Sequence, residues 1–187
     1  MNSIDDEKRI VQQAQQDPQR FAVLYDRYID RIYGYALRET ADAAVAEDIV
    51  SATFEKALEH LPHYRWRNTS FGAWLYKIAR NEMRMYWRKQ RWYVPLFDWF
   101  AGSSNVEQTA HLSHQLDELD VALSQLSKRD QEVLRLSYFE ELAHAEIAEV
   151  LDCSTRNVAL RLHRALKRLR KQMEKQAQEA LIDVTTS

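Results

Sequence analysis

Two short apolar patterns with helical spacing, separated by only three residues, constrain the fold of this chain more than any other feature. They occupy residues 142–170, and the interruption between them falls at residues 152–154. The first pattern contains Ile147, Ala148 and Leu151, and the second contains Val158, Leu162, Ala165 and Leu169. Apolar residues at such intervals lie on one face of an α-helix, and Ser154 can cap the second helix. The stretch therefore predicts two closely joined helices.

The second predicted helix carries a polar, basic face away from its apolar stripe. This face consists of Arg156, Asn157, Arg161, Arg164, Lys167, Arg168 and Lys171. Arginine can neutralise phosphates or bridge a guanine edge, while a companion helix fixes the angle of entry into the groove. The pattern favours a helix-turn-helix that binds duplex DNA, although basic runs are also typical of solvated helix faces.

The scarcity of helix breakers extends the helical prediction to the whole chain. Three glycines and three prolines occur in 187 residues, and no alternating Val/Ile/Thr run predicts a strand. We expect an all-α fold of two small helical domains joined by a linker. The single cysteine, Cys153, excludes an internal disulfide and a multi-cysteine metal site. A polar start and the absence of a long apolar run predict a cytoplasmic protein without membrane insertion.

Charge is distributed in blocks that the net value of −2 conceals. Residues 62–92 hold 8 Lys/Arg against 1 Asp/Glu, and residues 152–171 hold 7 against 1. Residues 1–61 hold 7 against 12, and residues 93–124 hold none against 5. Because a phosphate backbone responds to local charge, an acidic protein with this pattern can carry two nucleic-acid surfaces.

The acidic first third predicts two helices after a polar lead. Apolar residues recur at helical spacing from Phe21 to Ile32, and a second helix runs from Val45 until Pro62 ends it. The outer side of the second helix offers Glu47, Asp48, Glu55 and Glu59. This acidic face could be solvated or could bind a basic partner.

Aromatic and basic residues alternate through the loop and helix of residues 64–92. The aromatic members are Tyr64, Trp66, Phe71, Trp74, Tyr76, Tyr86, Trp87 and Trp92. The basic members are Arg65, Arg67, Lys77, Arg80, Arg84, Arg88, Lys89 and Arg91. Aromatic rings stack unpaired bases and cations follow the strand, so this mixture favours single-stranded nucleic acid. We expect Trp74, Leu75 and Ile78 in the core and Trp66 on the surface.

Turn-forming residues then mark a linker at residues 93–116. Helices resume near Leu116, with Ser127 and Asp130 resembling a capping box, and the polar tail after Met173 is expected to fray. The predicted domains are residues 1–92 and 117–173, with the linker at 93–116 and a tail at 174–187.

Three motifs in this order resemble the sigma-70 family of bacterial RNA polymerase initiation factors, in its extracytoplasmic function group. The motifs are AEDIVSATFEKA, FGAWLYKIARN and LSKRDQEVLRLSYFEELAHAEIAEVLDCSTRNVALRLHRALKRLR. The resemblance covers about residues 21–92 and 118–172. It implies an initiation factor that binds core RNA polymerase and promoter DNA, with an anti-sigma factor as a common partner.

The resemblance also implies roles for individual residues. Region 2 would bind the β′ clamp helices through Asp48, Thr53 and Phe54. It would capture a flipped minus 10 base with Arg65, Trp66, Arg67, Asn68, Thr69, Ser70 and Asn81, and hold the separating strands with Arg80, Arg84, Arg88 and Lys89. Region 4 would contact the β flap and read the minus 35 element through Ala159, Leu160, His163 and Arg164, with Arg156 and Arg161 near phosphates.

Other functions remain open at this level. A helix-turn-helix repressor or activator that does not join polymerase would explain residues 142–170 but not the aromatic block at 64–92. An adaptor without DNA function would fit if both basic faces are solvated. The histidines are His60, His63, His111, His114, His144 and His163. They form no HExxH or comparable motif, so we expect no enzyme, catalytic residue, metal or cofactor.

Overall fold

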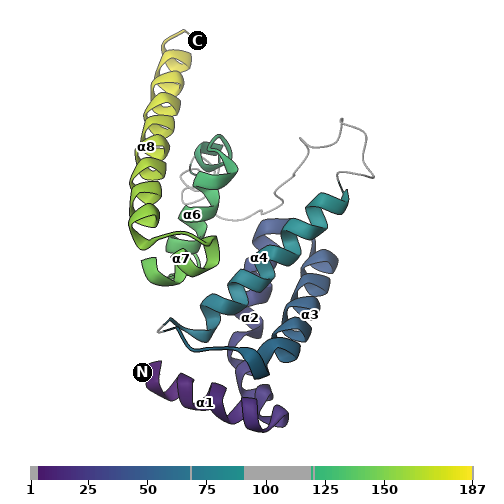
Figure 1. The fold of residues 1–187 in the computed structure, drawn as a ribbon. Coiled ribbons are helices and arrows are strands. Elements are labelled where there is room, and N and C mark those ends of the chain that lie inside the picture. Colours follow the sequence, from purple (N-terminus) through teal and green to yellow (C-terminus); the bar gives the residue numbers. More distant parts are fainter. Residues whose placement is uncertain (1–3, 68, 91–118, 120, 187) are drawn as a thin grey trace. The chain divides into compact units, whose positions relative to one another are not determined.

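The computed structural model describes residues 4–67, 69–90, 119 and 121–186, and within these ranges the chain is helical with no strand. The elements are α1 (Ile4–Gln16), η1 (Pro18–Arg20), α2 (Phe21–Thr40), α3 (Ala43–His60), η2 (Leu61–His63), α4 (Phe71–Gln90), α6 (Lys128–Tyr138), α7 (His144–Leu151) and α8 (Thr155–Thr186) (Figure 1). The predicted all-α fold is confirmed. The predicted linker at 93–116 lies outside the described residues, and the domain boundaries stay predictions.

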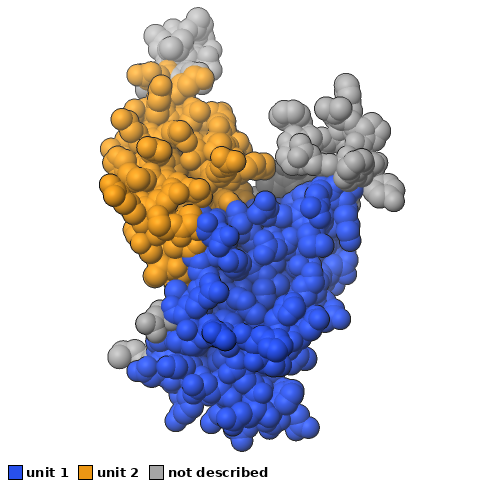
Figure 2. Space-filling model, viewed as in Figure 1, with its two compact units in different colours: residues 1–102, 149–152 blue, residues 103–148, 153–187 orange. Residues whose placement is uncertain are grey.

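The chain forms two compact units, residues 1–102 with 149–152 and residues 103–148 with 153–187 (Figure 2). No helix within the described part of the chain combines the length and apolar character needed to span a bilayer.

The first unit is a bundle in which α2 packs against α3 and α4, and α3 packs against α4. Its core includes Leu24 and Ile32 of α2, Ile49 of α3, and Leu75 and Tyr76 of α4. The turns are set locally by the sequence. Asp42 accepts a hydrogen bond from the N–H of Val45 at 3.2 Å and so caps α3.

Helix α1 occupies the segment that we had expected to be only a polar lead. Its buried side is formed by Glu7, Val11 and Ala14, which lie at intervals of four and three residues. A carboxylate therefore occupies a position where helical patterns usually show an apolar side chain. The buried Glu7 accepts a hydrogen bond from the hydroxyl of Tyr28, and burial followed by this bond raises the pKa of Tyr28 well above its usual range.

The second unit contains α6, α7 as far as Ala148, and α8, with Val133, Leu136, Ile147 and Val158 fully buried. α6 packs against α8. The two predicted caps are confirmed, since Ser127 Oγ accepts from the N–H of Asp130 and Ser154 Oγ accepts from the N–H of Asn157, each at 3.2 Å.

The turn between α7 and α8 places Asp152 in the left-handed region, with a φ of 55°. Aspartate tolerates this conformation better than most residues, which explains how the turn forms without glycine. The expectation that the tail frays after Met173 is wrong, because α8 continues to Thr186. Residues 174–181 are Glu, Lys, Gln, Ala and Leu, which are all strong helix formers, and no glycine or proline interrupts residues 174–186.

Candidate functional site

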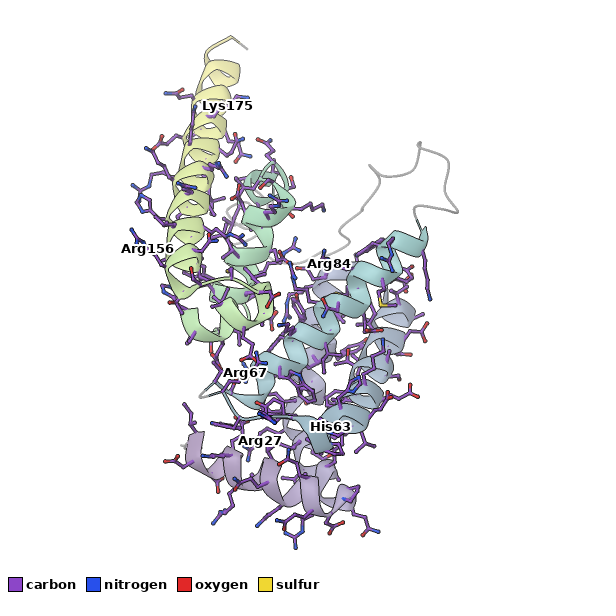
Figure 3. All side chains as sticks on the ribbon, viewed as in Figure 1. Arg27, His63, Arg67, Arg84, Arg156 and Lys175 are labelled. Carbon is purple, nitrogen blue, oxygen red and sulfur yellow. The ribbon has the colours of Figure 1, made fainter. Side chains whose placement is uncertain are left out.

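Helix α4 separates an apolar side from a basic side. Leu75, Tyr76, Ala79 and Met83 are buried against the bundle. The exposed residues include Asn81, Arg84, Arg88 and Lys89, whereas Arg80 is half-buried. Arg84 extends from the outer surface of α4 in Figure 3. The helix therefore presents an amide and several cations to solvent on the side opposite the core.

The loop that leads into α4 carries the other residues expected at a minus 10 site. Arg65 and Arg67 are exposed, and Trp66 is half-buried with its ring edge-on to that of Tyr64 at 6.5 Å. Ser70 Oγ accepts a hydrogen bond from the N–H of Ala73 at 3.2 Å, which caps α4. Thr69 directly precedes this cap, and Asn68 lies outside the described residues.

Trp74 belongs to an aromatic cluster rather than to the exposed basic side. Its ring centroid lies 4.7 Å from that of Tyr64 and 5.2 Å from that of Phe71. Of the three residues predicted in the core, Leu75 is fully buried, and Trp74 and Ile78 are half-buried.

Both ends of this loop are held by α1, which the sequence pattern did not reveal. Gln15 Nε2 donates to the carbonyl oxygens of Leu61 and Tyr64 at 2.9 and 2.8 Å. Glu7 Oε2 accepts from the N–H of Phe71, the first residue of α4, at 2.9 Å. These long-range hydrogen bonds are what identify Gln15 and Glu7 as residues that hold the loop, because no local sequence motif marks either of them.

Helix α3 carries an exposed acidic face. Its members are Glu47, Asp48, Ser51, Glu55, Leu58 and Glu59, and the apolar one, Leu58, is 43% exposed. The predicted polymerase-binding residues divide sharply. Asp48 is on this face, but Thr53 is fully buried and donates its hydroxyl to the carbonyl of Ile49 at 2.6 Å.

Phe54 is also part of the core, 5% exposed and packed against the rings of Phe21 and Tyr25. Both side chains are buried in this structure, and their polymerase-binding role stays a prediction. Their motif positions are explained by packing of α3 against α2, which fixes the direction of the acidic face.

Helix α8 exposes the side opposite Val158, Leu162 and Ala165. The exposed residues of the predicted minus 35 set are Arg156, Asn157, Ala159, Leu160, His163, Arg164, Lys167 and Arg168, and Arg161 is half-buried. Arg156 extends outward near the start of α8 in Figure 3. A cationic helix face with small and apolar members, including Leu160 at 48% exposure, suits the major groove of DNA.

A basic groove of about 890 Å³ lies between the start of α6 and the side of α8. Its cations are Arg129, Arg161, Arg164, Arg168, Lys171 and Lys175. Asp130 is the single acidic lining residue, and its Oδ2 lies 2.6 Å from an Arg168 guanidinium nitrogen. Arg168 is therefore paired inside the protein, while Arg129 and Lys175 extend the basic surface beyond the predicted face.

Comparison with known sequences matches both halves of the chain to one family. The description Sigma-70 region 2 fits residues 24–93, and Sigma-70, region 4 fits residues 116–169. The chain belongs to the sigma-70 family. The sigma factor is 34% identical over 167 residues to RNA polymerase sigma factor YlaC of Bacillus subtilis, covering 85% of this chain and 95% of YlaC. It is 31% identical over 150 residues to ECF RNA polymerase sigma factor SigM of the same organism, covering 79% and 91%.

These relatives place the sigma factor in the ECF group, as the sequence motifs predicted. The fold is also that of a solved sigma factor, RpoE of Bartonella quintana in complex with the anti-sigma factor NepR. The TM-score is 0.66 at 24% identity, over 82% of this chain and 96% of RpoE. The protein is therefore a transcription initiation factor that directs RNA polymerase to promoters, and the alternative of a free-standing repressor or activator is not favoured. Its relatives are transcription factors rather than enzymes.

Proposed function

We propose that three exposed helix faces divide the work of the sigma factor. The acidic face of α3 binds core polymerase, the basic side of α4 with the loop before it captures the melted minus 10 strand, and the outer face of α8 reads the minus 35 duplex. The observation that carries this proposal is that α4 and α8 each have a buried apolar stripe on one side and an exposed cationic face on the other.

The minus 10 role rests on the mixture of ring and cation around the start of α4. Trp66 offers a partly exposed ring, and Asn81 offers an amide that can pair with a base edge. Arg84, Arg88 and Lys89 lie farther along the same helix, where they can follow the phosphates of the separating strands. Extruding a base costs a few kcal/mol of stacking, which contacts of this kind offset.

The minus 35 role rests on the outer face of α8. Leu160 and Ala159 favour apolar contact with thymine methyl groups, while His163 and Arg164 can donate to base edges. The groove cations beside this face, including Arg161, Lys171 and Lys175, are suited to backbone phosphates rather than to bases. The flap of the polymerase β subunit is a further proposed contact of this unit.

The proposed polymerase contact centres on the acidic face, which includes the predicted residue Asp48 and lies on the helix that carries the buried Thr53 and Phe54. Asp48, Glu47, Glu55 and Glu59 supply negative charge around the exposed Leu58. An apolar residue surrounded by charges is typical of a protein interface with a desolvated centre and a polar rim. The β′ clamp helices are the proposed partner of this face.

The same proposal implies where in the cell the sigma factor acts and which other partners it has. Promoter DNA and core polymerase are cytoplasmic in bacteria, so the sigma factor is expected there. An anti-sigma factor is a candidate partner, supported by the complex of the similarly folded RpoE with NepR. No catalytic residue is assigned.

The test uses reconstituted holoenzyme and promoters selected from a fragment pool by the unaltered chain. The double variant Asn81→Ala with Trp66→Ala should slow the opening of duplex promoters about ten-fold. On templates that are already unpaired across the minus 10 element, the loss of transcription initiation should be smaller. Leu160→Ala should reduce discrimination among minus 35 sequences. Asp48→Asn with Glu55→Gln should weaken binding to core polymerase without DNA present.

The matched control is Asp26→Asn, a charge-neutralising change at an exposed position of α2 outside all three faces. The assignment fails if the three classes of variant lose the same activities in the same proportion. It also fails if the α4 variants lose duplex binding and opening equally.

A further inference from the structure

We propose that Glu7 and Gln15 of α1 are positioning residues for minus 10 recognition. They hold the two ends of the loop at residues 64–70, so that its exposed side chains are preformed for an unpaired strand. The inference rests on the proposed function of that loop, and it adds α1 to the promoter-opening machinery without any contact between α1 and DNA.

Gln15 fixes the beginning of the loop. Its side-chain nitrogen donates to the carbonyl oxygens of Leu61 and Tyr64, at 2.9 and 2.8 Å. The Leu61 carbonyl also accepts from the N–H of Tyr64 at 3.0 Å, which closes η2. Gln15 therefore adds a second donor at Leu61 and ties η2 to the carbonyl of Tyr64. One amide group therefore spans the whole turn from which Arg65 and Trp66 emerge.

Glu7 fixes the end of the loop. Its carboxylate is 5% exposed and accepts from the N–H of Phe71 at 2.9 Å, as well as from the hydroxyl of Tyr28. The guanidinium of Arg27 lies 3.8 Å away. A carboxylate at the first turn of α4 satisfies a donor that the helix leaves unpaired, and it interacts favourably with the helix dipole.

The consequence of these bonds follows from the cost of ordering a loop. Residues 64–67 and 70 belong to no helix or strand, so their conformation depends on how the ends are held. A loop that is ordered before binding loses less conformational entropy when it captures a base. Glu7 is buried and negatively charged, which makes direct contact with a DNA phosphate unfavourable. Its effect on promoter opening therefore acts through the loop.

The experiment centres on Gln15→Glu, which replaces the donating amide by a carboxylate that the two carbonyl oxygens repel. Gln12→Glu is the matched control, since it makes the same charge change at an exposed position of the same helix. The probe is a single-stranded oligonucleotide carrying the non-template minus 10 sequence of a promoter selected with the unaltered chain. Affinity is measured with reconstituted holoenzyme.

We expect Gln15→Glu to weaken oligonucleotide binding about five- to ten-fold, the worth of one or two lost hydrogen bonds, and to reduce discrimination against a scrambled oligonucleotide. Core binding and minus 35 duplex binding should match those of Gln12→Glu. Glu7→Gln should act in the same direction, since it weakens acceptance from the N–H of Phe71.

Three results would overturn the inference: oligonucleotide binding unaffected by Gln15→Glu, an equal loss in Gln12→Glu, or a proportional loss of core and minus 35 binding that indicates general unfolding. Trp66→Ala separates this inference from the proposed function. If Trp66→Ala weakens oligonucleotide binding and Gln15→Glu does not, only the positioning role fails. If Trp66→Ala has no effect, the role of the loop itself fails.

Discussion

Two glycines inside helices have different surroundings, so replacement by alanine should lower the stability at Gly72 but not at Gly34. A Cβ added to Gly72 in α4 would lie 2.5 Å from Cε1 and 3.1 Å from Cζ of the Tyr28 ring. A Cβ added to Gly34 in α2 would meet only the guanidinium of Arg38, at 3.1 Å or more. A long flexible side chain can move aside, whereas Tyr28 is buried and its hydroxyl is bound to Glu7.

The expected magnitudes follow from these distances. Carbon atoms in contact normally lie about 3.5–4.0 Å apart, so Gly72→Ala requires the Tyr28 ring to retreat by about 1 Å. Overpacking of this kind costs about 1–3 kcal/mol, and a weakened hydrogen bond to the Glu7 carboxylate adds to it. Alanine regains up to about 1 kcal/mol of helix preference. We expect Gly72→Ala to lower the free energy of unfolding by about 2 kcal/mol, and Gly34→Ala to leave it unchanged or raise it by about 0.5–1 kcal/mol.

Tryptophan fluorescence during chemical denaturation provides the assay. The three tryptophans in the described residues, Trp66, Trp74 and Trp87, belong to the first unit, and the sequences of α6, α7 and α8 contain none. Trp74, which packs against the neighbouring Phe71, is well placed to sense the change. A Gly72→Ala midpoint equal to or above that of Gly34→Ala would refute the reasoning, because helix preference alone would then explain both variants.

Three other measurements test the structure. Phe54→Ala should destabilise the first unit by about 3–5 kcal/mol, whereas Asp48→Asn should leave its fluorescence midpoint unchanged while weakening polymerase binding; equal stability losses would place both residues in the core. The raised pKa of Tyr28 contributes stability that is fully present below about pH 10 and is lost as the pH rises toward the folded-state pKa. The decrease of the denaturation midpoint at alkaline pH should therefore be smaller in Tyr28→Phe than in the unaltered chain. Asp130→Asn should lower the stability of the second unit by about 1 kcal/mol or less, because its Arg168 partner is largely exposed. The same change removes the acidic charge from the groove and should raise the affinity for duplex DNA. Unfolding followed by circular dichroism and binding followed by DNA titration should therefore show lower stability together with tighter binding.

Local chemistry accounts for the features that the sequence predicted well. Ser127 and Ser154 act as caps because each needs only a backbone N–H three residues away. The helical stripe of Val158, Leu162 and Ala165 is buried as its spacing indicated. In α4, Leu75 is fully buried as expected, whereas Trp74 and Ile78, which we also expected in the core, are half-buried.

The features that the sequence did not reveal depend on partners far along the chain. Glu7 looks like one more acidic residue in a polar lead until Phe71, 64 residues away, is seen to donate to it. Arg168 looks like a free DNA contact until its pairing with Asp130, 38 residues earlier, is known. Phe54 matches a family motif for a partner site, but no motif distinguishes a residue that touches the partner from one that supports the helix beneath.

The dependence of the recognition loop on α1 also affects how such proteins can be recombined. The family match begins at residue 24, after Glu7 and Gln15. A chimera that carries only residues 24–93 of this chain would separate the loop from Glu7 and Gln15, which hold its two ends. Transferring residues 4–93 as one block preserves both sets of bonds. The proposed positioning role therefore predicts that minus 10 specificity moves with residues 4–93 and not with residues 24–93 alone.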